Sequence, residues 1–274
     1  MRIPHPDDLP PSLRRLGGAL LSPRLRSTIA TRLQDLANAQ YRLDPRYRAN
    51  RAAIARLRGS RRGDVCVIMG NGPSVRGFDL ARLDGVDTFC LNRGYLLWNA
   101  AGRSPRYVVA TNNLVIEQFS GELADIAATR FLPWDYAGLF SDPDSLFVPL
   151  RWRRGFFTDI RRGLWVGGTV TFAAMQIAYH IGYRRVVLIG VDHAFTFEGR
   201  PNEKLTARDA DPNHFDPNYF GPGTAWHAPD LALSEVSYRM AKEAFERDCR
   251  EIVDATEGGK LRIFPKMPLE QALG

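Results

Sequence analysis

The sequence predicts an α/β protein with a Rossmann-like, doubly wound and mostly parallel sheet, an N-terminal helical extension and a long lid-like loop. Its 274 residues, of which 45% are hydrophobic and 24% charged, have the composition of a globular protein. From residue 64 onward, short apolar runs alternate with helical stretches, the pattern of a parallel sheet with helices on both faces. Residues 198–229 are rich in Pro, Asp, Asn and Gly and lack periodicity, and a loop of that length is usually functional.

The N-terminal part of the chain differs from the rest in composition. Residues 25–40 and 47–58 are rich in Ala, Leu, Arg and Gln, which predicts two helices, and the stretch 59–63 separates them from the remainder of the chain. We therefore divide the chain into a basic helical extension, 1–62, and a Rossmann-like nucleotide-binding catalytic domain, 63–274.

The extension is also the basic part of the chain. It holds fourteen arginines and four aspartates, so the remainder carries a net charge of −3 within a total of +7. Arginines spread over helices usually form a solvated face, which is the interpretation that we favour. Peripheral contact with an anionic membrane surface is the alternative, nucleic acid is not an expected partner, and a homo-oligomer is compatible with the sequence.

The apolar runs of the domain predict its elements in order. Strands are expected at Val65–Met69, 88–91, 107–110 and Arg185–Ile189, helices at 168–182 and 231–247, and a last strand at 261–264. The three cysteines lie far apart and are expected to be core residues rather than disulfides or zinc ligands. No apolar run is long enough to cross a bilayer and the first residues lack a signal peptide's apolar core, so we expect a cytoplasmic protein, at most peripheral at the inner membrane face.

The first predicted strand runs into a glycine-rich turn, Gly70-Asn71-Gly72-Pro73-Ser74. Glycines allow backbone amides to approach a phosphate closely, and the hydroxyl of Ser74 can donate to it or cap the next turn. The turn fails as a dinucleotide fingerprint because Val75 replaces the third glycine, and it lacks the lysine of a Walker loop. An ordinary strand-to-helix turn is the alternative to the nucleotide-phosphate site that we infer.

Two asparagines follow the next two predicted strands. Asn92 lies about twenty residues after the turn, where dinucleotide folds place an acidic residue against the ribose hydroxyls. Asn112 stands at the end of the third strand. The three strand ends deliver small polar side chains to one carboxyl edge, which predicts a ligand site there. The lack of a carboxylate at Asn92 argues against a nicotinamide dehydrogenase.

Arginines alternate with aromatic residues over 151–162, just before Gly167-Gly168-Thr169. Guanidinium groups suit carboxylates and phosphates, and the free amides of a helix start suit a second anion. A nucleic-acid surface is the competing interpretation. We favour a small-molecule anion, with Arg161 and Arg162 as its partners, because these arginines adjoin the predicted ligand edge.

Three of the five histidines, His193, His214 and His227, lie in the late loops. A histidine near a nucleotide site is the usual general base near neutral pH, so one of the three is a candidate base, and a structural role is the alternative. Asp192 ends a strand at the ligand edge and is the other candidate base; metal binding, if any, would use it. Residues 209–213 lack the glycine and distal glutamate of a calcium loop, so they predict a turn and no metal site.

On these motifs the sequence resembles the bacterial branch of the 6-hydroxymethylpterin diphosphokinase-like domain family, a domain also found in motility-associated flagellin glycosyltransferases. The resemblance covers residues 62–265. Its signatures are the 70–74 turn, Leu91-Asn92-Arg93, Gly168-Thr169-Val170-Thr171, Gly190-Val191-Asp192-His193, Asp211-Pro212-Asn213-His214-Phe215 and Tyr219-Phe220-Gly221.

The order of these motifs is also similar to that of bacterial CMP-sialic acid-dependent sialyltransferases, in which the turn and asparagines bind CMP and a late histidine is the base. The resemblance implies nucleotide contacts from Asn71, Gly72, Ser74, Asn92, Gly168 and Thr169, and a base at His214 or His227. Those enzymes hold the leaving phosphate with tyrosines after a Gly-Ile-Asp motif, whereas His193, Ala194 and Phe195 follow it here. His193 or Arg161 would then replace the tyrosines.

The resemblance predicts an inverting, sialyltransferase-like glycosyltransferase that moves an acidic sugar from a CMP-type nucleotide-sugar donor to a glycan or protein acceptor, as in the synthesis of a cell-surface glycan, without a cofactor. The alternative is pyrophosphoryl transfer from ATP to a pterin-like alcohol, which would require Mg²⁺. The metal motifs of the archaeal pterin diphosphokinases are not found in this sequence. The third hypothesis is a nucleotide-binding module without catalysis that docks through its basic N-terminus.

Overall fold

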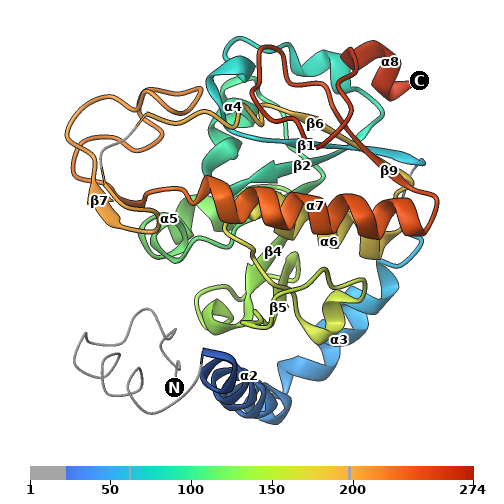
Figure 1. Cartoon of the computed structure of the whole chain (residues 1–274), viewed down its shortest axis with the longest axis vertical. Coiled ribbons are helices and arrows are strands. Elements are labelled where there is room, and N and C mark those ends of the chain that lie inside the picture. Colours follow the sequence, from blue (N-terminus) through green and yellow to red (C-terminus); the bar gives the residue numbers. More distant parts are fainter. Residues whose placement is uncertain (1–22, 62, 197–198) are drawn as a thin grey trace.

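The centre of the protein is a seven-stranded parallel sheet, shown in Figure 1. The computed structural model describes residues 23–61, 63–196 and 199–274. The strands lie in the order β5-β4-β3-β2-β1-β6-β9, and every neighbouring pair is parallel. Their bounds are β1 Val65–Met69, β2 Asp87–Leu91, β3 Tyr107–Val109, β4 Thr129–Pro133, β5 Ser145–Val148, β6 Arg185–Ile189 and β9 Glu251–Asp254. The predicted α/β class with a Rossmann-like sheet is confirmed.

Helices cover both faces of the sheet, so the fold is doubly wound. One apolar cluster joins the sheet to α3 (Arg46–Arg56), α6 (Val170–Ile181) and α7 (Leu231–Arg247). A second cluster joins the other face to α4 (Tyr95–Ala100), α5 (Asn113–Ala124) and α8 (Leu269–Leu273). Because successive strand residues point to opposite faces, Ile68 belongs to the first cluster and Val67 to the second.

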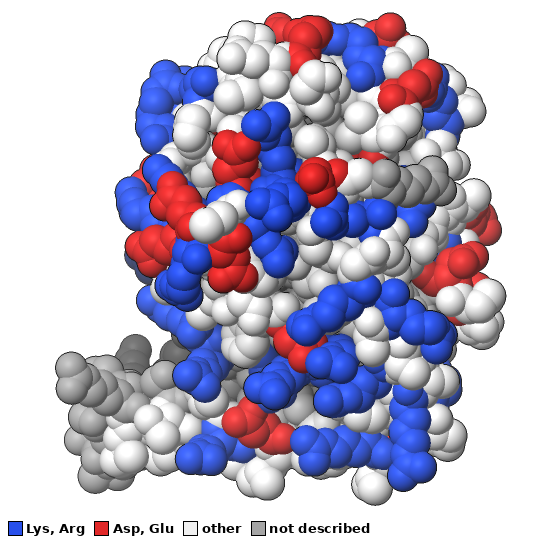
Figure 2. Space-filling view, turned by 90° about the vertical axis from the view of Figure 1, so that its right-hand side faces the viewer, with Lys and Arg blue, Asp and Glu red and all other residues white. Residues whose placement is uncertain are grey.

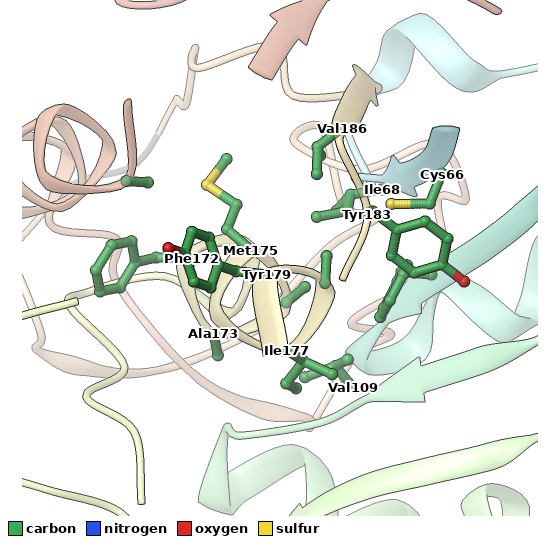
Figure 3. Close-up of a cluster of buried hydrophobic side chains, with 14 of the residues drawn as sticks. Cys66, Ile68, Val109, Phe172, Ala173, Met175, Ile177, Tyr179, Tyr183 and Val186 are labelled. Carbon is green, nitrogen blue, oxygen red and sulfur yellow. The ribbon is translucent and has the colours of Figure 1, made fainter. Parts of the chain in front are cut away.

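Helix α6 is the most deeply buried helix of the first face. Its residues from Thr171 to Ile181 are all buried, which agrees with the nearly continuous apolar sequence predicted to be a helix there. Figure 3 shows its side chains, including Ile177, in one cluster with Ile68 of β1 and Val109 of β3. Among the described residues, no helix is long and apolar enough to cross a membrane.

The helices before the sheet, α2 (Pro23–Gln40) and α3, are confirmed close to their predicted positions. Helix α3 is part of the domain rather than an appendage to it. Asn50 donates from Nδ2 to the carbonyl of Phe147 and accepts from the amide of Phe147, both at 2.8 Å, so it closes the free edge of β5. Ile54 is buried in the first apolar cluster. The expected boundary at 62/63 therefore does not coincide with a break in the packing; residues 1–22 of the expected extension lie outside the described residues.

The C-terminal part of the sheet differs from the prediction. Residues 261–264 form no strand; the last strand is β9, which follows α7 directly and holds only two apolar residues, Ile252 and Val253. Leu261 and Phe264 are nevertheless buried in the first cluster, because the chain after β9 folds back onto it. Of the cysteines, Cys66 and Cys90 are buried as expected, whereas Cys249 is exposed.

The aromatic residues of the long loop after β6 pack into the protein. Phe215, Tyr219 and Phe220 are buried. The loop also contains an antiparallel hairpin of β7 (Lys204–Thr206) and β8 (Ala225–His227). Gln118 of α5 bonds both the amide and the carbonyl of Ala225, which fastens the hairpin to that helix. Residues 197 and 198, at the start of the loop, lie outside the described residues.

Candidate active site

The candidate site lies where the strand order reverses. The chain moves from β1 outward to β5 on one side and then returns to place β6 on the other side of β1. In open parallel sheets, ligands bind outside the carboxyl ends of the strands at such a switch point. The 70–74 turn follows β1, Asn92 follows β2, and Asp192 comes shortly after the end of β6, so three of the predicted site segments meet there.

The turn packs against the segment that follows β6. The amide of Gly70 donates to Ile189 O at 2.7 Å, and the amide of Gly72 donates to Gly190 O at 3.0 Å. A Cβ atom at Gly70 would overlap Gly190 O, and one at Gly72 would overlap the Asp192 carboxylate. The glycines therefore permit close packing of two strand ends. The expectation that these two amides are open to a phosphate is wrong, because backbone carbonyls already occupy them.

Asp192 is bound to the same turn. Its Oδ1 accepts from the amide of Ser74 at 3.2 Å and its Oδ2 accepts from the Ser74 hydroxyl at 2.7 Å. Both donors that the sequence offered to a phosphate at Ser74 are therefore engaged by a carboxylate. The same contacts hold Asp192 as a structural partner of the turn, which weakens its candidacy as a base.

Two asparagine oxygens at the switch point are buried without a donor. Asn71 donates from Nδ2 to Leu91 O at 2.9 Å and to the Tyr219 hydroxyl at 2.8 Å. Asn92 has a left-handed backbone with φ of 47°. Oδ1 of each is buried and, within the part of the chain that the structure describes, accepts no hydrogen bond. A buried acceptor without a partner costs free energy, so these oxygens favour a ligand that brings N–H or O–H groups.

A buried tyrosine joins the late loop to the turn. The hydroxyl of Tyr219 accepts from Asn71 Nδ2 and from the amide of Arg93, the latter at 3.2 Å. The Arg93 guanidinium donates to Tyr219 O and lies over the Phe119 ring, 3.7 Å from its centroid. The amide of Phe215 donates to Asn71 O at 2.9 Å. Burial raises the pKa of Tyr219, so its side chain stays a neutral phenol.

His214 lies on this tyrosine and is oriented by an aspartate. Its ring stacks on the Tyr219 ring, with 3.9 Å between centroids and 6° between planes. Nδ1 lies 2.7 Å from Oδ2 of Asp211, and the Asp211 side chain is only 5% exposed. An ionised carboxylate only accepts hydrogen bonds, so Nδ1 carries the proton and Nε2 is the basic nitrogen. The second oxygen of Asp211 accepts from the amide of Asn213 at 2.8 Å, which fixes the carboxylate.

His193 and the start of α6 lie on the α7 side of the site. Nε2 of His193 is 3.3 Å from Oε1 of Glu235, and its ring lies edge-on to Tyr238. The Tyr238 hydroxyl is 3.5 Å from Thr169 Oγ1. Thr169 also caps α6 by accepting from the amide of Thr171 at 3.3 Å. Gly168 is exposed beside Leu233, so this helix start remains accessible next to His193.

The structure does not bring Arg161 and Arg162 to the switch point. Arg161 forms a two-pronged ion pair with Asp159, with Nη2 at 2.7 Å from Oδ2. The same carboxylate lies 3.7 Å from Nδ1 of His180, in the last turn of α6. Thr169 caps the opposite end of that helix, roughly 15 Å away along its axis. The expectation that these arginines adjoin the ligand edge is therefore wrong; Arg161 is paired with Asp159 near the far end of α6.

Two further candidate residues, Asn112 and His227, make other contacts along the edge of the sheet. Oδ1 of Asn112 caps α5 by accepting from the amides of Leu114 at 3.0 Å and Val115 at 3.4 Å. His227 ends β8, opposite Lys204, in the hairpin that is fastened to α5. Of the two histidines that the sequence left open as bases, His214 is therefore the one that packs on the residues of the turn.

Several residues of the site had no role in the sequence-based prediction. Tyr219 and Arg93 fall in recognised motifs, yet their roles depend on contacts across more than a hundred residues of chain. Asp211 acts on His214, only three residues away. Arg76 stands two residues after the turn and donates from Nε to Phe215 O at 3.1 Å. From sequence alone, a cation at this site could have been inferred from the position of Arg76 next to the turn. No group of three or more His, Cys, Asp or Glu side chains suited to a metal ion occurs among the described residues.

Comparisons with known proteins give a distant structural similarity. No family model matches the chain, and no curated protein matches it. Among solved structures, the chain is similar to the MAf glycosyltransferase from Magnetospirillum magneticum AMB-1, with 16% sequence identity and a TM-score of 0.48. The similarity covers 81% of this chain and 38% of that one, so the chain spans well under half the length of that protein.

Proposed function

We propose that this chain is a glycosyltransferase that binds a nucleotide-sugar donor at the switch point between β1 and β6 and uses His214 as its general base. The observation that carries the proposal is the chain of contacts Asp211–His214–Tyr219–Asn71. It connects an oriented imidazole to the turn at the ligand edge of the sheet. General bases near neutral pH are most often histidines whose other nitrogen is held by a carboxylate.

The nucleoside part of the donor fits the acceptor-rich side of the site. The unpartnered Oδ1 atoms of Asn71 and Asn92 suit ribose hydroxyls or the exocyclic amine of a base, both of which donate hydrogen bonds. The phosphate needs donors instead. Arg76, beside the turn, and the exposed Gly168 at the start of α6 are the groups of suitable chemistry.

The chemical step uses Nε2 of His214, the ring nitrogen that Asp211 does not hold. Nε2 takes the proton of the acceptor hydroxyl while the hydroxyl oxygen attacks the anomeric carbon of the donor sugar. The bond between that carbon and the phosphate oxygen breaks, and the nucleotide leaves with the electron pair. Attack opposite the leaving group inverts the anomeric configuration. The aspartate at position 211 keeps Nδ1 protonated, so the same ring nitrogen is basic in every turnover.

The finer identity of the substrates rests on the sequence resemblance. It favours a CMP-type donor with an acidic sugar, as in sialyltransferases, and a glycan or protein acceptor. Pyrophosphoryl transfer to a pterin-like alcohol differs in requiring a divalent cation to neutralise the phosphates. Activity in the presence of a chelator therefore separates the two reactions.

The test is a transfer assay with His214→Gln. Donors with CMP, UDP and GDP are incubated with and without chelator, and release of free nucleotide is measured at saturating donor. The proposal expects release from one class of donor, insensitive to chelator, and about 10²–10⁴-fold slower in His214→Gln, with donor affinity nearly unchanged. His227→Gln is the matched control and should turn over like the unsubstituted protein. Equal rates for His214→Gln and the control would refute the assignment of the base.

A further inference from the structure

Helix α2 is turned with its polar side toward the body of the protein. Asn38 donates from Nδ2 to Leu150 O at 3.3 Å, and Gln34 accepts from the amide of Trp152. Asp35 pairs with Arg151 at the edge of this contact. Gln34 and Asn38 are the buried side chains described for the helix. A surface helix of a globular protein ordinarily buries its apolar residues instead.

The apolar residues of α2 lie on the opposite side, in solvent. Ile29, Leu33 and Leu36 are 41%, 48% and 67% exposed. Their spacing of four and three residues places them in one stripe along the helix, which we call the α2 stripe. Leu25, 47% exposed, continues it by a further turn. At 100° per residue, the stripe is centred nearly opposite Gln34 and Asn38. Large exposed apolar patches rimmed by polar residues mark interaction sites.

Positive charge is concentrated in the part of the chain that carries the α2 stripe. Residues 23–62 contain eleven arginines and two aspartates. Arg32 flanks the stripe on α2 itself and is exposed, as are Arg42, Arg48 and Arg51 after it. Figure 2 shows Lys and Arg dominating the charge of the lower part of the molecule, at the height of α2 and α3 in Figure 1. The surface thus combines an apolar strip with a dense excess of cations.

We propose that α2 docks on an anionic lipid surface, with the α2 stripe inserted among the head groups and the arginines bound to their phosphates and carboxylates. Interfacial helices have this combination of an apolar face with flanking Lys and Arg, and their binding depends on both. Pairing of two copies through the stripe would instead bring two sets of arginines together, and like charges repel. This inference goes beyond the proposed function and does not depend on it, because the candidate active site is built from residues outside α2.

Vesicle flotation of the full chain tests the proposal. The vesicles are phosphatidylcholine alone or phosphatidylcholine mixed with phosphatidylserine, at low and high salt. The test variant is Ile29→Ser/Leu33→Ser/Leu36→Ser. The matched control is Leu139→Ser/Val236→Ser, which alters apolar side chains that are 55% and 38% exposed elsewhere on the surface. Melting temperature and oligomeric state are measured for all three proteins.

The proposal expects binding to the phosphatidylserine vesicles that weakens at high salt, by counter-ion screening, and weakens at least ~10-fold in the stripe variant but not in the control. Four outcomes would overturn it. One is that the unsubstituted chain does not float, and another is that the stripe variant floats equally well. A further outcome is that the chain is a dimer, does not bind lipid, and becomes a monomer in the stripe variant. The stripe variant loses much of its thermal stability, which would show that the stripe packs within the chain.

Discussion

At the scale of single residues, the ring of His214 is held by two different kinds of contact. Asp211 fixes one nitrogen by a hydrogen bond, and Tyr219 fixes the plane of the ring by stacking. The tyrosine is itself held by Asn71 and the Arg93 amide. Replacing Asp211 should therefore change the orientation of the ring and which ring nitrogen carries the proton. It should not change where the nucleotide-sugar donor binds.

We predict that Asp211→Asn lowers kcat by about 10- to 100-fold, with a nearly unchanged KM for the donor. The neutral amide accepts a weaker hydrogen bond than a carboxylate, and its NH2 group can face Nδ1 instead, which would place the proton on the wrong ring nitrogen. Asp211→Glu, which keeps the carboxylate, should recover part of the loss. The measurement is the steady-state rate of nucleotide release. If Asp211→Asn lowers only donor affinity, the carboxylate acts on binding and not through His214.

A second residue-scale prediction concerns Asp159, which stabilises the far end of α6. The hydrogen bonds from the Arg161 side chain hold the pKa of Asp159 at about 2, below the ordinary value of 3.8. A carboxyl whose pKa is lower in the folded state stabilises the fold above its unfolded pKa and loses that effect as the pH falls through the folded value. Asp159→Asn should therefore lower the melting temperature at pH 7, and the difference from the unsubstituted protein should shrink between about pH 4 and pH 2. A difference that stays constant over this range would contradict the ion pair's role.

At the scale of elements, α3 acts as the border of the sheet. The edge of β5 would otherwise present unpaired backbone groups, and Asn50 of α3 bonds both the amide and the carbonyl of Phe147. Ile54 then places the following turn of α3 in the core. Exposed strand edges template association with other chains, so this side chain contributes to solubility as well as to stability.

We predict that Asn50→Ala lowers the free energy of unfolding by about 1–3 kcal/mol, because a buried amide and carbonyl lose their partners together. Denaturant unfolding measures the change, and light scattering on heating should show earlier aggregation. Asn99→Ala, at an exposed position of α4, is the matched control. An Asn50→Ala protein as stable as the control would mean that solvent satisfies the β5 edge equally well.

The strands also show which parts of the fold can be predicted from sequence. β1 and β6 are continuous apolar runs, because parallel strands buried on both faces need them. β4, β5 and β9 of the sheet were not predicted. β4 contains Arg130, which is buried through an ion pair with Asp142, and β9 has too few apolar residues to show a pattern. In β4 a contact outside the strand allows the sequence to depart from the apolar pattern.

At the scale of the whole molecule, the candidate site depends on contacts between distant segments. The sequence predicted that the ends of the strands converge, because strand polarity alone implies it. It did not predict that the Asp192 carboxylate accepts the hydrogen bonds of Ser74, or that Arg161 lies at the end of α6 opposite the site. Both depend on which polar groups pair with each other in the folded chain. Tyr219 and Asn71 are 148 residues apart, and no local pattern relates them.

The most direct test of the central claim, that a nucleotide binds at the switch point, is calorimetric titration of CMP, UDP, GDP and ATP into the protein and into Asn92→Gly. Glycine retains the left-handed backbone of Asn92 and removes its side chain, including the buried Oδ1. Asn202→Gly is the control, since Asn202 also has a left-handed backbone, with φ of 64°. We predict saturable binding of one nucleotide class, weakened at least ~10-fold by Asn92→Gly and unchanged by Asn202→Gly. If no nucleotide binds, or if both variants bind as the unsubstituted chain does, the switch point is not the nucleotide site.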